Sequence, residues 1–110
     1  MRNKNLPSLF SDFAYNFNPS SLPISSINIF KICLADWVAV SIAAQKSKVA
    51  EKILSLAEDD GGLQDSFIFG HKSYVSCKTA ALINGTISHT LDYDDTHFDY
   101  LGHPSVVVLS

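Results

Sequence analysis

Apolar residues recur at helical spacing along most of this 110-residue chain. The clearest case is KSKVAEKILSLAE, where four apolar and four charged residues would fall on opposite faces of a helix. The inward set is Val49, Ile53, Leu56 and Ala57, and the outward set is Lys48, Glu51, Lys52 and Glu58. The following DDGG stops the pattern, because glycine readily takes the left-handed cap conformation. A helix is therefore predicted over residues 46–58.

The segments before this helix predict two more. PSLFSDFAYNF predicts a short helix over residues 7–17 that ends near Asn18 and Pro19. SSLPISSINIFKICLADWVAVSIAAQ predicts a long helix over residues 20–45, with Pro23 in its first turn, where a missing N–H costs nothing. Apolar residues wrap nearly all round this long helix, which is typical of an interior helix. They are Ile27, Phe30, Leu34, Trp37 and Val38, but also Ile29, Ile32 and Val40.

The segments after residue 62 predict three further elements. DSFIFG, at residues 65–70, is expected to form a short extended piece. SCKTAALINGTISHTL predicts a helix over residues 76–91 with Ser76 as its N-cap. Its small residues would let another backbone approach closely; they are Ala80, Ala81, Gly85 and Ser88. HPSVVVLS predicts the opening of a fifth helix or strand, with Pro104 in the first turn. The predicted fold class is all-α, with one domain or a piece of one.

Charge and composition exclude several function classes. The net charge is −3 and no basic residue follows Lys78, so the basic face that nucleic acid requires is missing. Lys31 and Asp36 interrupt the longest apolar run, which favours a buried helix in a soluble protein over a membrane span. Cys33 and Cys77 form no CxxC pair or zinc spacing, and no targeting segment is evident, so two free thiols in the cytoplasm are expected.

The same composition predicts an incomplete domain. Charged residues make up 17% of the chain, against about 25% in an ordinary soluble domain. The apolar run at residues 106–109 is unfinished where the sequence stops. Together with the all-round apolar helix, these features predict the N-terminal part of a larger enzyme domain. An exposed apolar face would then make the chain, by itself, poorly soluble.

Histidines and acidic residues are concentrated in HTLDYDDTHFDYLGHPS, at residues 89–105. This stretch holds three of the four histidines and four of the eleven acidic residues, without Lys or Arg. It does not match a calcium loop, because the positions that require glycine and glutamate hold His97 and His103. A DDxxD magnesium motif fails at Phe98, no HExxH is present, and the spacing of His89 and Asp92 is only weak evidence for a metal.

Two interpretations of this stretch remain. In the structural one, it is a polar turn between helices in which Asp94, Asp95 and Asp99 cap backbone N–H groups. In the functional one, the loop folds back so that Asp92, Thr96 and His103 meet in one pocket while Asp99 faces solvent. The N-terminus of the helix after His103 would then offer a seat for a substrate carboxylate. Such a group of residues suits proton abstraction next to a carbonyl, or protonation of a leaving hydroxyl.

The segment AALINGTISHTLDYDDTHFDYLGHPSVVVL, at residues 80–109, resembles the signature region of the MmgE/PrpD family. NG, H-x-x-D-[YF]-D-D-T and G-H-P-S occur in it in that order. LADWVAVSIAA, at residues 34–44, resembles the second helix of the family, so the resemblance extends from about Leu22 onward. The family includes 2-methylcitrate dehydratase and cis-aconitate decarboxylase.

The resemblance implies a fold and a set of site residues. Family members are several times longer, with a large helical domain and a smaller α/β lid domain, and usually form homodimers. Residues 1–110 would be part of the N-terminal helical domain. Asp92, Thr96 and His103 match positions that line the family's active site, whereas the adjacent His97 is not carried over. The implied substrates are small di- and tricarboxylates, and the implied reaction needs no metal or organic cofactor.

The resemblance further implies a lyase. The main expectation is elimination of water from a 2-methylcitrate-like substrate, with Asp92 and His103 as proton-handling or orienting groups and Thr96 bonded to a substrate carboxylate. The alternatives are a cis-aconitate decarboxylase-like reaction, or a non-catalytic remnant that only associates with another chain. Residues 79–110 contain no Lys or Arg, so the cations for an anionic substrate must come from elsewhere. The chain alone is therefore expected to be inactive.

Overall fold

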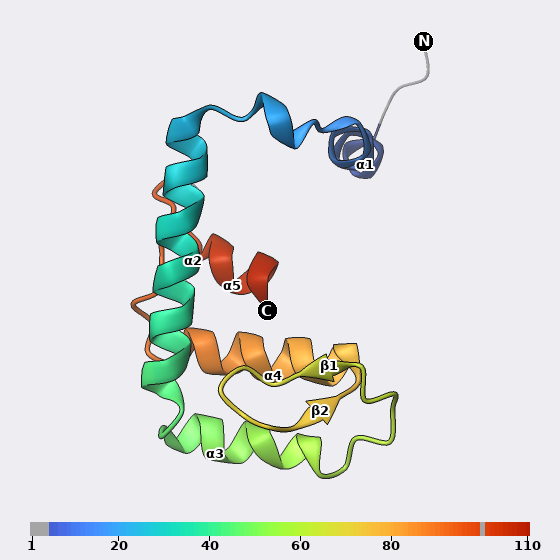
Figure 1. Ribbon diagram of the computed structural model, residues 1–110, viewed down its shortest axis with the longest axis vertical. Coiled ribbons are helices and arrows are strands. Elements are labelled where there is room, and N and C mark those ends of the chain that lie inside the picture. The colour runs from blue at the N-terminus through green and yellow to red at the C-terminus, as the bar shows by residue number, and fades with distance from the viewer. Residues whose placement is uncertain (1–4, 100) are drawn as a thin grey trace.

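The chain is mainly helical, as the computed structural model in Figure 1 shows. The structure describes residues 5–99 and 101–110. In chain order the elements are α1 (Leu6–Asn16), the 3-10 turn η1 (Pro19–Ser21), α2 (Ile24–Ala44), α3 (Lys48–Leu54), the 3-10 turn η2 (Ser55–Ala57), β1 (Ser66–Phe67), β2 (Tyr74–Val75), α4 (Cys77–His89) and α5 (Pro104–Leu109). The all-α class predicted from the sequence is confirmed, apart from one two-stranded antiparallel hairpin.

Most element boundaries follow local signals that the sequence carries. Asn5 caps α1 by accepting the N–H of Ser8, and Ser47 caps α3 by accepting the N–H of Ala50. Pro23 stands at the N-cap of α2 instead of within its first turn, so the long helix begins at Ile24. The last apolar segment forms a helix, with Pro104 in its first turn as predicted. The strand β2 had no counterpart among the predicted elements.

The α3 face that meets the core differs from the predicted one. Ala50 is fully buried, and Ile53, Leu54 and Ala57 pack against the core. Val49 and Leu56, which were predicted to point inward, are 45% and 39% exposed. The buried set still follows helical spacing, but it is rotated by about one residue, so that Ala50 rather than Val49 faces the core. The charged residues predicted to point outward are exposed, as expected.

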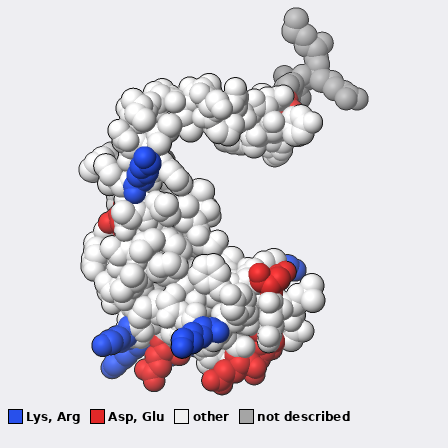
Figure 2. Space-filling view, in the orientation of Figure 1, with Lys and Arg blue, Asp and Glu red and all other residues white. Residues whose placement is uncertain are grey.

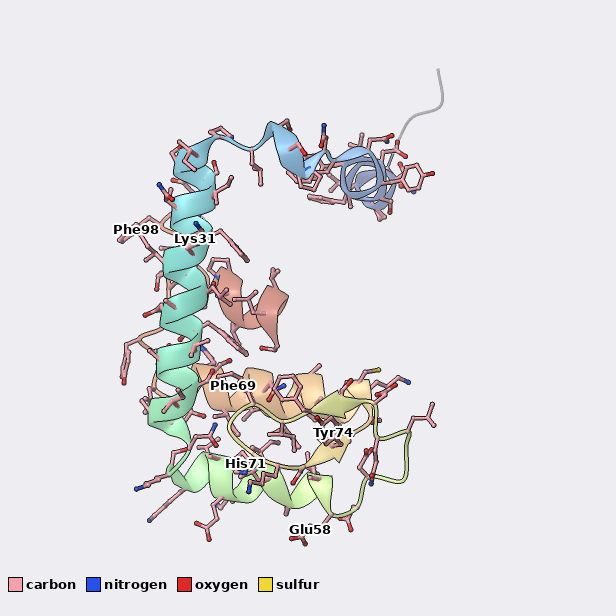
Figure 3. All side chains as sticks on the ribbon, viewed as in Figure 1. Lys31, Glu58, Phe69, His71, Tyr74 and Phe98 are labelled. Atoms are coloured by element: carbon pink, nitrogen blue, oxygen red, sulfur yellow. The ribbon has the colours of Figure 1, made fainter. Side chains whose placement is uncertain are left out.

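The core lies where the C-terminal end of α2, helices α3 and α4, and the hairpin meet (Figure 1). Its buried members are Ala44, Ala50, Ile68, Val75, Ala80, Ile83 and Ile87. Phe69 extends this packing towards α2, where its ring centroid lies 5.3 Å from that of Trp37 (Figure 3). Gly85 of α4 faces α5, and a Cβ added there would lie 3.4 Å from the Ser110 hydroxyl. The nearest atoms belong to the side chains of Ser110 and Val106 at ordinary van der Waals distance, so the predicted close approach of another backbone is not found at Gly85.

The expectation that α2 is an interior helix is wrong for this chain by itself. Only Trp37, Val40, Ser41 and Ala44 of α2 are buried, all in its C-terminal half. Ile24, Ile29 and Ile32 are more than 60% exposed, and α1 buries none of its residues. Figure 1 shows α1 and the first turns of α2 extending away from the core. The predicted exposed apolar face is thus present, and it covers most of the N-terminal half.

α2 is also the one helix, within the described residues, that is long and apolar enough to cross a membrane. Its C-terminal half packs into the core, and Asp36, near its middle, accepts a hydrogen bond from the backbone N–H of Asp95. A carboxylate bonded to another segment suits a helix that packs on protein. That α2 belongs to a protein outside the membrane stays a prediction.

Asp60 joins the loop after α3 to the start of α4. Its carboxylate accepts the Ser76 N–H at 2.6 Å, the Ser76 hydroxyl at 2.9 Å and the Thr79 hydroxyl at 3.0 Å. Ser76 occupies the predicted N-cap position, but its hydroxyl bonds Asp60 rather than a backbone N–H of α4. The Ser76 N–H is the main cause that holds the pKa of Asp60 below its ordinary value, and the two hydroxyls add to it.

Candidate functional site

The loop between α4 and α5 begins with a reversal at Asp92. This residue adopts a positive φ of 55°, and its N–H donates to the carbonyl of His89 at 3.1 Å. Aspartate is one of the few non-glycine residues that tolerate this left-handed conformation. The reversal ends α4 and turns the chain back along α2. A second short turn follows, in which the His97 N–H donates to the Gly102 carbonyl at 2.8 Å.

Asp95 fastens this loop to two helices. Its carboxylate accepts the N–H of Ser105 at 3.3 Å and the hydroxyl of Ser105 at 2.8 Å, while its own N–H donates to Asp36 at 3.0 Å. The structural interpretation, in which an aspartate caps a backbone N–H, is thus right for Asp95. One N–H group at the N-terminus of α5, where a seat for a substrate carboxylate was predicted, is thus already bonded to this side chain, and the seat itself stays a prediction.

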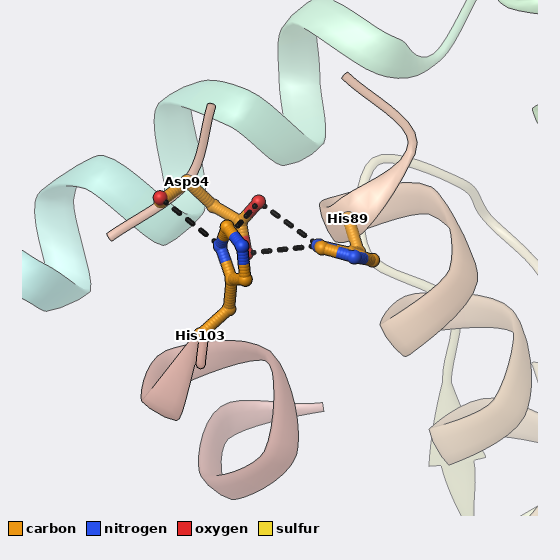
Figure 4. Close-up of side chains that lie close together, drawn as sticks. All are labelled: His89, Asp94 and His103. Atoms are coloured by element: carbon orange, nitrogen blue, oxygen red, sulfur yellow. Dashed lines mark hydrogen bonds and ion pairs between the residues drawn. The ribbon is translucent and has the colours of Figure 1, made fainter. Parts of the chain in front are cut away.

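Asp94 is the centre of a cluster that joins three segments (Figure 4). Its side chain is only 1% exposed. His89, at the end of α4, places Nδ1 at 3.1 Å and 3.3 Å from the two carboxylate oxygens. His103, just before α5, places Nδ1 at 3.3 Å from Oδ1 and at 3.2 Å from the backbone carbonyl of Asp94. The two imidazole rings meet edge to face, with their centroids 4.6 Å apart.

The three residues predicted from the sequence lie around this centre. Oδ1 of Asp92 is 3.6 Å from Nε2 of His103, and also 3.8 Å from Nε2 of His89. The hydroxyl of Thr96 donates to the Asp94 carbonyl at 3.3 Å, the same oxygen that Nδ1 of His103 approaches. Asp99 is exposed, as predicted. The structure therefore brings Asp92, Thr96 and His103 together, whereas their roles stay predictions.

Sequence reasoning missed two members of the cluster. Asp94 was interpreted as a capping residue, but its carboxylate accepts from the imidazole of His89 and lies 3.3 Å from Nδ1 of His103. His89 was considered only as a weak metal ligand with Asp92. The burial of Asp94 depends on where α2 and α5 pass, which no local pattern reports. The signal for His89 was its position at the last turn of an apolar helix, three residues before Asp92.

The site is acidic, and the groups that face its carboxylates are imidazoles. Among the described residues, the carboxylates of Asp92 and Asp94 lie within 4 Å of ring nitrogens of His89 and His103 rather than of Lys or Arg side chains. On the face shown in Figure 2, most lysines lie near α3, and Lys31 lies on the upper part of α2 (Figure 3). Behind the loop, burial raises the pKa of the Cys33 thiol, and the charge and hydrogen bond of the Asp95 carboxylate raise it further. Cys33 is therefore a protonated thiol, and it is free.

A metal ion is one possible occupant of the cluster. His89, Asp94 and His103 offer ligand atoms within 4.8 Å of one another, and two imidazoles with a carboxylate form a donor set that zinc accepts. The same atoms, however, already pair with one another as hydrogen-bond donors and acceptors. The arrangement is explained without an ion.

An open depression lies beside the cluster on the α4 side. It has a volume of about 500 Å³. His89 lines it together with mostly apolar neighbours from α3, α4 and α5, among them Val49, Leu82 and Val106. This depression adjoins the imidazole of His89 rather than that of His103. That Asp92, Thr96 and His103 line one pocket stays a prediction.

Comparison with known proteins gives one match. The family described as MmgE/PrpD N-terminal domain matches residues 8–110, which is nearly the whole chain. The matched region includes α2, the loop after α4 and all residues of the cluster. No curated protein and no solved structure matches the chain.

Proposed function

Because the chain belongs to the MmgE/PrpD family, we propose that it supplies the proton-handling part of a lyase site for small di- and tricarboxylates. The observation that carries this proposal is the approach of Asp92 to His103, at 3.6 Å, on a loop held by α2 and α5. A carboxylate beside an imidazole is a pair that can take up and release a proton near neutral pH.

The preferred reaction is a dehydration like that of 2-methylcitrate dehydratase. A base removes a proton from the carbon next to a carboxylate, and an acid protonates the departing hydroxyl, which leaves as water. Asp92 and His103 are the proposed acid and base, in either order. Thr96 is exposed beside them, and its hydroxyl is proposed to bond a substrate carboxylate. Neither a metal nor an organic cofactor is required for these steps.

The second candidate is a decarboxylation like that of cis-aconitate decarboxylase. Here the substrate loses carbon dioxide and the carbanion left behind takes a proton from one of the same residues. The half-buried imidazole of His103 beside the exposed Asp92 carboxylate serves this protonation as well as it serves elimination. The choice between the two reactions depends on how the substrate carboxylates are held, and the cluster itself contains no fixed cation.

The cations that anchor the substrate would come from outside residues 79–110. Charge-assisted hydrogen bonds from Lys or Arg are the usual means of holding a di- or tricarboxylate. In this proposal further segments of the enzyme, or a second subunit of a cytoplasmic homodimer, supply them. The exposed apolar surface of α1 and α2 would be covered in the same assembly.

A graft tests the proposed reaction. Residues 8–110 replace the matching segment of a full-length family enzyme, and the purified graft is given 2-methylcitrate, citrate and cis-aconitate. Proton NMR identifies the products, so that water loss and decarboxylation are separated directly. Turnover of one of these acids is expected. A graft that folds and assembles like its parent, yet converts none of them, would favour the non-catalytic alternative.

A further inference from the structure

The catalytic roles proposed above for Asp92, Thr96 and His103 leave Asp94 without a function. It is the most deeply buried carboxylate of the loop, with a side chain 1% exposed. A buried carboxylate must be compensated by hydrogen-bond donors or opposite charge. The groups that meet its oxygens are Nδ1 of His89 and Nδ1 of His103, at 3.1 Å and 3.3 Å from Oδ1. The Asp94 carboxylate therefore contacts both imidazoles.

These contacts decide which ring nitrogen carries the proton. A carboxylate and a carbonyl can only accept hydrogen bonds, so an imidazole that pairs with them through Nδ1 must carry hydrogen there. For His89 the acceptors are the two oxygens of the Asp94 carboxylate. For His103 the acceptor is the backbone carbonyl of the same residue, while Oδ1 lies 3.3 Å from this nitrogen. Both rings are thereby held with Nδ1–H inward.

The opposite edges of the two rings also converge. Nε2 of His103 and Nε2 of His89 lie 3.6 Å and 3.8 Å from the same oxygen of Asp92. Asp92 is 78% exposed, so this edge of the cluster faces solvent. The Nε2 atoms of both rings thus lie near one exposed carboxylate. With Nδ1 already protonated, each Nε2 acts as a base when the ring is neutral and as an acid when it is charged.

We propose that Asp94 is a positioning residue that locks His89 and His103 into the same Nδ1–H form, so that their two Nε2 atoms face the substrate side as a matched pair. His89 thereby joins His103 as a ring prepared for proton transfer. The use of this pair in turnover rests on the proposed lyase function. The locked form itself is a property of the chain without substrate, and it can be measured independently.

Nitrogen NMR tests the lock on the 110-residue chain. Long-range ¹⁵N–¹H spectra of uniformly ¹⁵N-labelled protein distinguish Nδ1–H, Nε2–H and doubly protonated rings for each of the four histidines. At a pH where the rings are neutral, His89 and His103 are expected in the Nδ1–H form. A wild-type spectrum in which both rings carry hydrogen on Nε2 alone would overturn the proposal, whatever the variants do.

The variant Asp94→Asn is expected to affect the tautomers of the two rings differently. The buried amide needs an acceptor for its N–H groups, and the neighbouring acceptor available is an imidazole Nδ1. His89 is expected to change to the Nε2–H form, because His103 keeps the backbone carbonyl as its own acceptor. An aspartate-to-asparagine change in a catalytic triad produces the wrong tautomer in this way. Unchanged tautomers in a folded Asp94→Asn protein would contradict the assignment.

Matched controls use the other two aspartates. Asp99→Asn alters an exposed carboxylate of the same loop, and Asp92→Asn alters the one that faces Nε2. Both variants are expected to keep Nδ1–H on His89 and His103. If Asp92→Asn changes the tautomers as strongly as Asp94→Asn does, the positioning role does not belong to Asp94. Failure of the graft to turn over substrate, with the tautomers as expected, would refute the lyase proposal alone.

Discussion

Nε2 of His103 lies 3.6 Å from Oδ1 of Asp92, although eleven positions along the chain separate the two residues. The chain achieves this through the left-handed turn at Asp92 and the fastening of Asp95 to Ser105. An exposed carboxylate beside a half-buried imidazole thus results from the geometry of the loop.

Thr96 is predicted to act through its hydroxyl in substrate binding. In the graft, Thr96→Val should raise KM about 10- to 100-fold, the equivalent of a hydrogen bond to a charged group worth about 1.5–3 kcal/mol. The value of kcat should change little, because the bond is made equally in ground and transition states. Thr96→Ser, which keeps the hydroxyl, serves as the control. Equal KM values for the valine and serine variants would exclude this role.

The Asp95 carboxylate should be the main fastening of the loop. Asp95→Ala removes the hydrogen bonds to Ser105 and leaves the Ser105 N–H without its acceptor. A loss of about 1–3 kcal/mol in the free energy of unfolding is expected, measured by urea titration. Asp99→Ala, in the exposed turn of the same loop, should stay within about 0.5 kcal/mol of wild type. Similar losses for both variants would show that Asp95 has no special role.

Asp60 should make stability depend on pH in the acid range. Its pKa in the folded chain is lowered from the ordinary 3.8 by the Ser76 N–H, so the unfolded chain binds the proton more readily. The stabilisation is therefore present above pH 3.8 and is lost as pH falls through the lower pKa of the folded state. Thermal melts of Asp60→Asn should approach wild type as pH falls through this range. Asp59→Asn, at an exposed neighbour, is the control.

The apolar surface of α2 predicts self-association of the isolated chain. Ile29 and Ile32 are 62% and 68% exposed, and they lie on one long apolar helix. Light scattering of the purified chain should give a mass above that of a monomer, because contiguous apolar patches promote association. Ile29→Lys with Ile32→Lys should reduce this mass, whereas Leu63→Lys, in an exposed loop, should not. A monomeric wild-type chain would contradict the prediction.

The sequence predicted the helices better than it predicted what they bury. Caps and stops are local, so α1, α3 and α5 could be recognised from a few residues such as Asn18 and Pro104. The inward face of α3 depended on which side of the helix packs on the core, and the exposure of α2 depended on which segments cover it. Both depend on tertiary packing, which the periodicity of apolar residues does not determine.

In the site, too, the features set by local signals could be predicted, whereas those set by tertiary packing could not. The helix exit at Asp92 and the helix start at Pro104 were enough to bring Asp92, Thr96 and His103 together. The sequence could not predict that Asp95 caps the start of α5 while Asp94 faces the histidines, because neighbouring aspartates in a loop have equal capping potential. Only the path of the loop past α2 decides that Asp94 faces inward to the histidines while Asp95 bonds the start of α5.

The central claim is that His103 handles a proton in a lyase reaction. Steady-state kinetics of the graft carrying His103→Gln tests it, with circular dichroism to verify folding. Turnover should fall by about 10²–10⁴-fold, the usual contribution of a positioned acid or base. His97→Gln, in the exposed turn nearby, should retain turnover close to that of the unmutated graft. A folded His103→Gln graft with near-normal turnover would contradict the claim.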